Sequence, residues 1–218
     1  ITCRDWSSDV CSSDLLSLGK AFAAYLKLLG DPAAVGLLLA GGMSFAGMFA
    51  YITASPYYFI EMQGFSPRAY SLLFATNAFG IFAANYANSR LVRRVGAVGM
   101  IGGACLTGFT GALTLLIGVS LHDLLPLAIA GLFLMVSVTG LLGANCVGML
   151  MERYPVNTGA AAALFVSGQF GLGMLASAAV SYLHDGSGLP MAGVIAATAT
   201  TSVLGFLVFR YAQRRAHP

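Results

Sequence analysis

Six long apolar stretches, none with a charged side chain, constrain the fold of this chain more than any other feature. They are residues 33–60, 69–89, 95–121, 124–151, 156–183 and 186–209. Each is at least as long as the roughly 20 residues that a helix needs to cross a hydrocarbon core of about 30 Å. Only 9% of the chain is charged, whereas soluble domains average about 25%. The sequence therefore predicts an all-α membrane protein with six transmembrane helices.

Small residues inside these stretches predict how closely the helices pack. Glycine weakens a helix in water, but in lipid small residues let neighbouring helices approach closely. One four-residue spacing suggests a contact stripe on the third stretch, formed by Gly99, Gly103, Thr107 and Gly111.

The basic residues that border the stretches predict the orientation of the helices. If successive helices alternate in direction, nine lysines and arginines after residue 15 fall on one side and only Arg68 on the other. Positive residues are enriched in cytoplasmic loops, so we expect both termini in the cytoplasm. Because the basic residues lie between apolar stretches, the net charge of +3 does not indicate nucleic-acid binding. The nine are Lys20, Lys27, Arg90, Arg93, Arg94, Arg153, Arg210, Arg214 and Arg215.

The first 15 residues do not follow this pattern. They hold the only tryptophan, and they lack the basic-then-apolar order of a signal peptide. Residues 4–15 resemble one reading frame of a common sequencing adapter, so we expect residues 1–15 to be an assembly artefact and the chain to be a fragment. We expect residues 16–32 to form a cytoplasmic linker with a short amphipathic helix, residues 33–209 the transmembrane unit and residues 210–218 a cytoplasmic tail. Asp31 and Pro32 predict the start of the first transmembrane helix, with the acid as its N-cap and proline at the first helical position.

Two loops on the side away from the cytoplasm, at residues 121–123 and 183–185, both read Leu-His-Asp. Histidine and aspartate are common in metal sites and in the active sites of hydrolases, so both kinds of site are candidates. Short turns use Asp and Gly for backbone reasons alone, and a metal site would need about four ligands brought together. Within the stretches no histidine lies at membrane depth to activate a serine, and Cys105 and Cys146 show no metal-ligand spacing. We therefore expect neither an enzyme nor a metal or cofactor site.

Four polar side chains lie deep inside the stretches, namely Tyr51, Asn77, Asn145 and Gln169. An amide in hydrocarbon must find a partner, so such residues face other helices or a water-filled cavity. Two interpretations remain open at this point. The residues either form hydrogen bonds between helices, worth about 0.6 kcal/mol on average, or they line a cavity.

Charged residues are expected to gather where the second and fourth stretches end on the cytoplasmic side. The expected cluster comprises Arg90, Arg93, Arg94, Glu152 and Arg153. An arginine of the second stretch could pair with Glu152, although exposed ion pairs contribute only about 0–1 kcal/mol. The favoured interpretation is a plain orientation signal.

Seven short motifs together resemble one transporter family. They are YITASPY (51–57), GFSP (64–67), LFATNA (73–78), RLVRRVG (90–96), GAAAAL (159–164), QFGLG (169–173) and DGSGLPM (185–191). In these motifs the chain is similar to the second half of Bcr/CflA-type (bicyclomycin-resistance) multidrug exporters, members of the major facilitator superfamily. The resemblance implies that residues 33–209 are the C-terminal half-domain of a twelve-helix fold.

Such transporters bind substrate near the midplane, between two six-helix halves. The resemblance implies that the first, second, fourth and fifth stretches line the cavity, while the third and sixth face lipid. Apolar and aromatic side chains there would accommodate varied ligands. The candidate cavity residues are Phe45, Met48, Tyr51, Asn77, Asn145 and Gln169.

The resemblance also implies a function, a location and partners. The chain is expected to be part of a drug exporter driven by proton antiport and alternating access in the bacterial inner membrane, and to be inactive alone. Its expected partners are a missing N-terminal six-helix half that carries the acidic proton carrier, membrane lipids, amphipathic drug-like substrates and protons, with no nucleic acid. Two alternatives remain: a metabolite or sugar carrier on the same fold, or a non-transporting assembly subunit.

Overall fold

The computed structural model describes residues 25–26, 28–121 and 124–216. Every regular element in this part of the chain is a helix, which confirms the predicted all-α class. The elements are α2 (Pro32–Pro56), the π-helical turn η1 (Tyr57–Met62), α3 (Pro67–Ser120), α4 (Leu125–Arg153), α5 (Thr158–Tyr182) and α6 (Leu189–Ala216). The expected artefact at residues 1–15 and the first part of the expected linker lie outside the described residues, so that domain layout stays a prediction.

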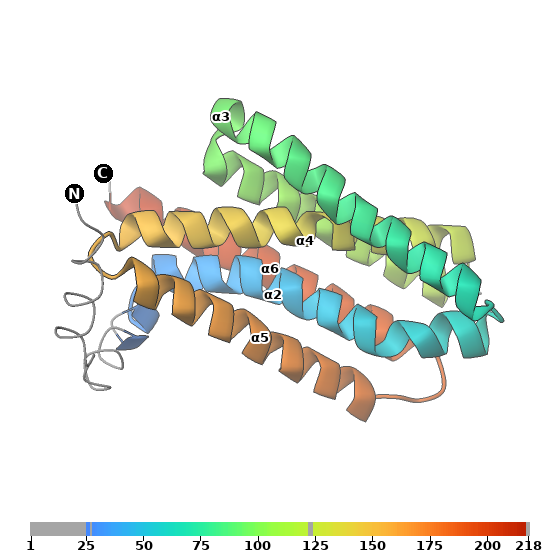
Figure 1. Ribbon diagram of the computed structural model, residues 1–218. Helices are drawn as coiled ribbons and strands as arrows, with labels where there is room; N and C mark the ends of the chain where they lie inside the picture. Colours follow the sequence, from blue (N-terminus) through green and yellow to red (C-terminus); the bar gives the residue numbers. More distant parts are fainter. Residues whose placement is uncertain (1–24, 27, 122–123, 217–218) are drawn as a thin grey trace, which may run out of the picture.

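Five helices in the described residues are long and apolar enough to cross a membrane, where the sequence predicted six. The difference lies in α3, whose 54 residues contain both the second and the third predicted stretch. A straight helix of that length would span about 80 Å, far more than a bilayer. Figure 1 shows that α3 instead turns back on itself, so that its two limbs run side by side with α4.

The reversal in α3 is made at Gly96, whose backbone has φ 78° and ψ 155°. Only glycine adopts this region readily, because a Cβ would clash with the backbone there. We call residues 67–95 the first limb and residues 97–120 the second limb. The arginine-rich segment that the sequence assigned to a loop is therefore helical up to Val95, and basic residues are favourable in the last turns of a helix.

The predicted start of the first apolar stretch is confirmed. Asp31 caps α2 by accepting a hydrogen bond from the Ala33 N–H at 3.0 Å, and Pro32 occupies the first helical position. At the other end, α2 gives way to η1 directly after Pro56. Proline lacks the N–H that would continue the α-helical ladder, so the change of helix type at this residue has a local cause.

Close helix packing uses other glycines than the predicted stripe. Gly99 and Gly103 are exposed, and a Cβ at Gly103 would meet nothing within 4 Å. The second limb instead touches α4 at Gly111 and Gly118, where a Cβ would lie 2.7 Å from the Gly131 carbonyl oxygen and 2.6 Å from the Ala128 nitrogen, respectively. The predicted stripe was therefore wrong except at Gly111, because a four-residue spacing alone does not say which face of a helix is covered.

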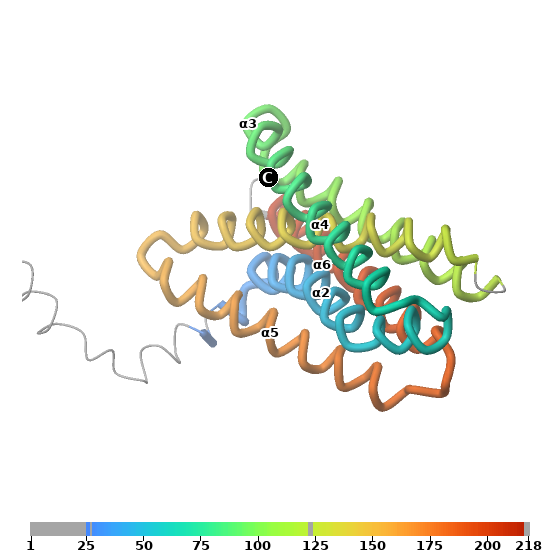
Figure 2. Tube along the Cα trace, turned by 45° about the vertical axis from the view of Figure 1, so that its right-hand side comes forward, coloured from blue at the N-terminus to red at the C-terminus, as the bar shows by residue number. Residues whose placement is uncertain are grey.

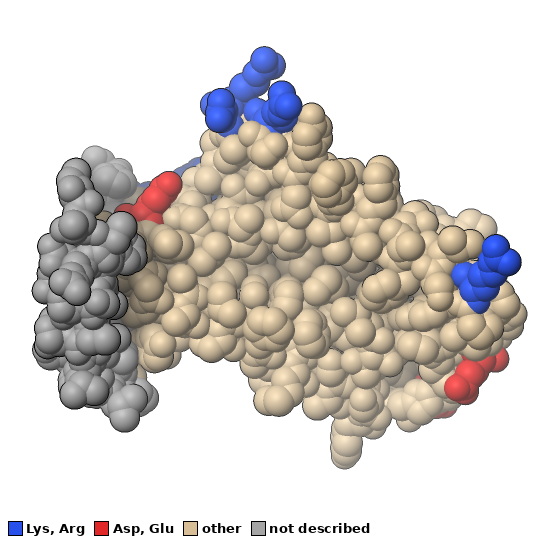
Figure 3. Space-filling view, in the orientation of Figure 1, with Lys and Arg blue, Asp and Glu red and all other residues tan. Residues whose placement is uncertain are grey.

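Helix α2 lies at the centre of the bundle and packs against α4, α5 and α6, as the turned view in Figure 2 also shows. We name the two ends of the bundle by their charged residues. The Arg153 end contains the start of α2 and the end of α4, and the Glu61 end contains η1 and the 183–188 link. Figure 3 shows a broad uncharged surface between groups of charged side chains, as expected for helices that cross a bilayer.

Candidate functional site

A hollow of about 320 Å³ opens between α2, the first limb of α3, α4 and α5. These four segments correspond to the four stretches that the resemblance assigned to a cavity. We call this hollow the central cavity. Its lining residues are Phe45, Met48, Ile81, Thr139, Gly140, Gly143, Ala144, Val147, Phe165, Val166 and Gln169. Three of the six candidate residues therefore line the central cavity, Phe45 and Met48 from α2 and Gln169 from α5.

The absence of a side chain at Gly143 leaves the central cavity open between α4 and α5. Gly140 also lines the cavity, but it is a close-contact position, because a Cβ there would clash with Asn85 Nδ2 on the first limb of α3. A Cβ on Gly143 would have the Gln169 Oε1 as its nearest neighbour, 3.9 Å away. The amide of Gln169 therefore faces open space beside α4 rather than a packed helix.

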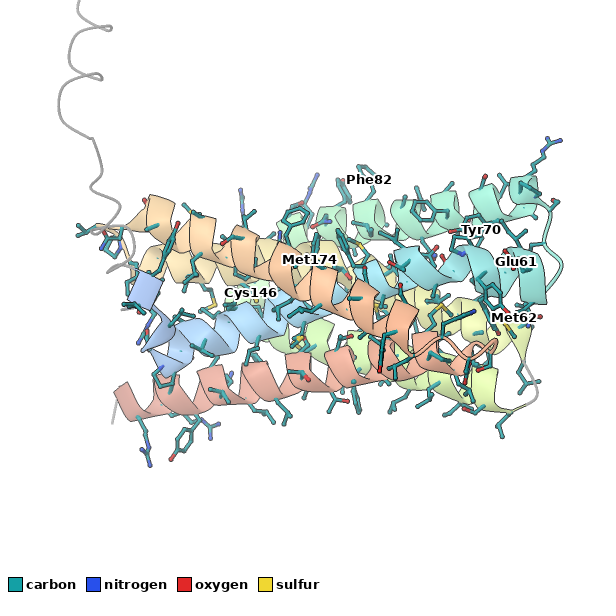
Figure 4. The ribbon with its side chains drawn as sticks, turned by 90° about the horizontal axis from the view of Figure 1, so that it is seen from below. Glu61, Met62, Tyr70, Phe82, Cys146 and Met174 are labelled. Carbon is teal, nitrogen blue, oxygen red and sulfur yellow. The ribbon has the colours of Figure 1, made fainter. Side chains whose placement is uncertain are left out.

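Aromatic rings form the wall of the bundle beside the central cavity. The ring centroid of Phe45 lies 5.0 Å from that of Phe49 and 5.1 Å from that of Phe170. On the first limb of α3, Phe79 and Phe82 are both 66% exposed, and Figure 4 shows Phe82 projecting away from the bundle. The cavity lining itself is mostly apolar, with Phe45 and Phe165 as its aromatic residues, a composition that suits amphipathic ligands.

Tyr51 and Asn77 do not line the central cavity. Asn77 Nδ2 donates to Tyr51 Oη at 3.0 Å, and the two residues are only 2% and 1% exposed, respectively. The structure thus shows the interhelical alternative for this pair, since the bond joins α2 to the first limb of α3. The Asn77 Oδ1 is buried and has no hydrogen-bond partner among the described residues.

Asn145 also bonds to a neighbouring helix and is absent from the cavity wall. Its Nδ2 donates to Asn88 Oδ1 at 2.8 Å and to the Leu141 carbonyl at 2.7 Å. The residue is 7% exposed and ties α4 to the first limb of α3 at the same depth as Ala144 and Val147, which line the cavity. A role of Tyr51, Asn77 and Asn145 in substrate binding stays a prediction.

Sequence reasoning missed much of the cavity lining. Phe165 and Val166 lie one turn before Gln169 on α5, and Thr139 precedes Gly140 on α4. Residues three or four apart share a face of a helix, so the spacing from Gln169 back to Phe165 was a usable signal. The position of Gln169 had been weighed by its depth alone.

The predicted charge cluster separates into two parts. Arg90, Arg93 and Arg94 surround a hollow at the end of the first limb, where Arg90 donates to the Tyr86 hydroxyl at 3.2 Å. Arg153 instead forms an ion pair with Asp31, with Nε donating to Oδ2 at 2.5 Å. In the described part of the chain no ion pair includes Glu152, so the suggested pairing of an arginine with Glu152 is not formed.

At the Arg153 end, the carboxylate of Asp31 accepts hydrogen bonds from three residues. The Tyr154 hydroxyl donates to its Oδ2 at 2.6 Å, in addition to the bonds from Arg153 and from the Ala33 N–H. Partial burial raises the pKa of Asp31, but the three hydrogen bonds outweigh it, so the net pKa lies below the usual 3.8. Sequence reasoning had treated Asp31 only as a helix cap, and it missed that α4 ends beside it.

The described residues hold no group of three or more His, Cys, Asp and Glu side chains that could bind a metal ion. Of the two Leu-His-Asp links, residues 122–123 lie outside the described residues. In the other link, His184 packs its ring edge-on against Tyr57, with the centroids 4.5 Å apart.

Two curated proteins match most of this chain. A bicyclomycin resistance protein homolog of Haemophilus influenzae is 28% identical over 184 residues, which cover 84% of this chain and 46% of that protein. The uncharacterized MFS-type transporter YdgK of Bacillus subtilis is 24% identical over 190 residues, or 87% of this chain and 47% of that protein. The resemblance to major facilitator superfamily transporters is confirmed.

The matches cover only part of each relative. The chain spans about half the length of the curated relatives it matches. No family model matches the chain, and no solved structure matches it. Together with the long apolar helices, the similarity to these transporters identifies a multi-pass membrane protein.

Proposed function

We propose that this chain forms one half, the C-terminal half, of a proton-coupled exporter of amphipathic drug-like molecules. The single observation that carries the proposal is the central cavity, an apolar hollow of about 320 Å³ that contains Phe45, Met48 and Gln169. A second six-helix unit would cover it and complete a substrate site near the midplane. The name of the Haemophilus influenzae relative, a bicyclomycin resistance protein homolog, supports a drug-like substrate.

The proposed mechanism is alternating access in the bacterial inner membrane, with both termini in the cytoplasm. The two halves rock about the central cavity, and a proton moves inward as a drug moves outward. Proton coupling requires a group that titrates within the membrane. The six apolar stretches of this chain contain no charged residue, so we assign the proton carrier to the other half and expect this half to be inactive alone.

The chemistry of the cavity favours drug-like substrates over sugars. A sugar offers many hydroxyl groups, and each needs a partner when it leaves water. The side chains that line the cavity offer Thr139 and Gln169 as their polar groups among the described residues. Aromatic and thioether side chains, by contrast, adapt to apolar ligands of varied shape.

The test begins with the source DNA. Sequencing across the region before Leu16 is expected to reveal six further apolar stretches with an acid inside one of them. The complete gene, expressed in bacteria that lack their own exporters, is then expected to lower the accumulation of a fluorescent amphipathic dye, and collapse of the proton gradient should abolish this effect. Nutrient uptake instead of dye export would replace the proposal with the carrier alternative.

Two glycines of α4 provide a test variant and a matched control for the role of the central cavity. A Cβ on Gly143 enters the central cavity, whereas one on Gly148, outside the cavity lining, meets nothing within 4 Å. We expect Gly143→Leu to reduce dye export about tenfold, a barrier change of about 1.4 kcal/mol, and Gly148→Leu to leave it nearly unchanged. Equal export by both variants would mean that the hollow is not the substrate site.

A further inference from the structure

A second hollowed surface lies on the opposite side of the α2–α5 contact, between α5 and α6. It consists of two hollows that follow one another along the same three helices, one of about 300 Å³ at mid-depth and one of about 290 Å³ at the Glu61 end. We call this surface the α5–α6 groove. Its floor is α2 from Met43 onward together with Tyr57 at the start of η1, and its walls include Leu175 and Ala179 on α5 and Ala197 on α6.

The α5–α6 groove is separated from the central cavity by direct contacts between α2 and α5. Thr53 Oγ1 donates to Ser177 Oγ at 2.8 Å, which joins the floor of the groove to its α5 wall. One turn deeper, Gly173 lies against the Phe49 ring, and a Cβ there would stand 3.1 Å from it. The groove therefore opens on the outer surface of the bundle, where lipid surrounds a multi-pass protein.

The polarity of the groove changes along its length. At mid-depth its side chains are almost all apolar, with Met43, Leu172 and Val194 among them. At the Glu61 end it gains the hydroxyl groups of Thr53 and Ser181 and the imidazole of His184. Leu172 lies ten helical residues before Tyr182, the last residue of α5, or about 15 Å along the axis. That length is close to one leaflet of a hydrocarbon core about 30 Å thick.

The charged residues near the Glu61 end of the α5–α6 groove favour one kind of lipid headgroup. No lysine or arginine is among the described residues that line either hollow, so an anionic headgroup finds no cation there. Asp185 follows His184 in the chain and is exposed at the rim, next to the lining residues His184 and Ser187 but not itself part of the lining. Hydrogen bonds from the Ser187 hydroxyl and N–H lower the pKa of Asp185, so it carries a negative charge at neutral pH. A carboxylate next to an imidazole matches a headgroup with an ammonium next to a phosphate.

We propose that the α5–α6 groove binds one zwitterionic aminophospholipid of the leaflet at the Glu61 end. An acyl chain lies between α5 and α6, the phosphate accepts a hydrogen bond from His184, and the primary ammonium faces Asp185. The inference requires only that the chain spans a membrane, and it is independent of the proposed drug transport.

Quenching of a single tryptophan by brominated lipids tests this site. In the full chain with Trp6→Phe, Leu175→Trp places the reporter on the groove wall, and Leu106→Trp places it on the second limb of α3, away from the groove. The two positions are matched, with Leu175 62% and Leu106 63% exposed. Each protein is reconstituted in vesicles in which a fixed mole fraction of phosphatidylethanolamine, phosphatidylcholine or phosphatidylglycerol carries bromine on its acyl chains.

We expect brominated phosphatidylethanolamine to quench the Leu175→Trp reporter at least twofold more than the other two lipids. All three should quench the Leu106→Trp reporter alike, because that position samples bulk lipid. Adding His184→Ala and Asp185→Asn should abolish the preference at position 175 and leave quenching at position 106 unchanged, which also shows that the variant is inserted. Equal quenching by all three lipids at both positions, or a preference for phosphatidylglycerol or phosphatidylcholine at position 175, would overturn the proposal.

Discussion

The two faces of α4 use glycine for opposite purposes. On the face toward the second limb of α3, a Cβ on Gly131 would lie 2.6 Å from the Gly111 carbonyl oxygen, so the two backbones are in contact. On the face toward α5, a Cβ on Gly143 would have 3.9 Å of free distance to its nearest neighbour, and the missing side chain leaves the central cavity open. At Gly131 the missing side chain lets two helices come into backbone contact, and at Gly143 it leaves an open space. The difference comes from what lies opposite each glycine.

Substitution of Gly131 and Gly143 by alanine should reveal the difference between the two faces of α4 most strongly. We expect Gly131→Ala to lower the free energy of unfolding in detergent by about 3 kcal/mol, because its methyl group would meet backbone atoms that cannot move aside. Gly143→Ala should leave it unchanged or slightly raised, since alanine is the better helix former. Thermal unfolding followed by circular dichroism measures both. Similar losses for the two variants would show that α4 is equally packed on both faces.

The reversal at Gly96 provides the next largest effect. We expect Gly96→Ala to cost about 2 kcal/mol, because φ 78° with ψ 155° strains any residue that has a Cβ. The loss should come from the backbone alone, since nothing lies within 4 Å of a Cβ at this position. Gly103→Ala is the control, with equally open surroundings inside a regular helix. If both variants unfold at the same temperature, Gly96 does not make the reversal.

The buried pair of Tyr51 and Asn77 should give a smaller effect. A double-mutant cycle of Tyr51→Phe and Asn77→Ala is expected to yield a coupling energy of about 0.6 kcal/mol, the average for hydrogen bonds between membrane helices. Unfolding in detergent measures it. Gln169→Ala combined with Tyr51→Phe is the control, because Gln169 faces the central cavity and the changes should be additive. Zero coupling between Tyr51 and Asn77 would show that their bond does not stabilise the fold.

The ion pair at the Arg153 end should have the smallest effect and a definite pH dependence. Because the folded pKa of Asp31 lies below 3.8, its contribution is present above that pH and is lost as the pH falls through the folded pKa. We expect Asp31→Asn to cost about 0.5 kcal/mol at pH 6, as for a partly exposed pair. The difference in melting temperature from the unchanged chain should shrink as the pH falls below 3.8.

Glu152→Gln serves as the control for this prediction. Glu152 is exposed and forms no ion pair among the residues that the structure describes. Its substitution should change the melting temperature little at either pH. A difference for Asp31→Asn that grows as the pH falls below 3.8 would contradict the assigned direction of the pKa shift.

The candidate site was predictable where depth and side-chain type decide it. Gln169, Phe45 and Met48 lie in the central cavity, on stretches that the resemblance had assigned to it. Tyr51 and Asn77 satisfied the same depth argument, yet they bond to each other between α2 and α3. A polar group in hydrocarbon needs a partner, but the sequence does not say whether that partner is water, ligand or another helix.

The sequence alone determined that this chain is helical and crosses the membrane repeatedly. Charge-free stretches of more than about 20 residues are stable in a bilayer, and there their backbone N–H and C=O groups must form hydrogen bonds within helices. It also determined local features such as the cap at Asp31 and the reversal near the arginine-rich segment. Only the tertiary structure decided which glycines touch, that Arg153 pairs with Asp31, and where the two hollows open. Those outcomes depend on which faces of distant helices meet, and no property of one helix fixes them.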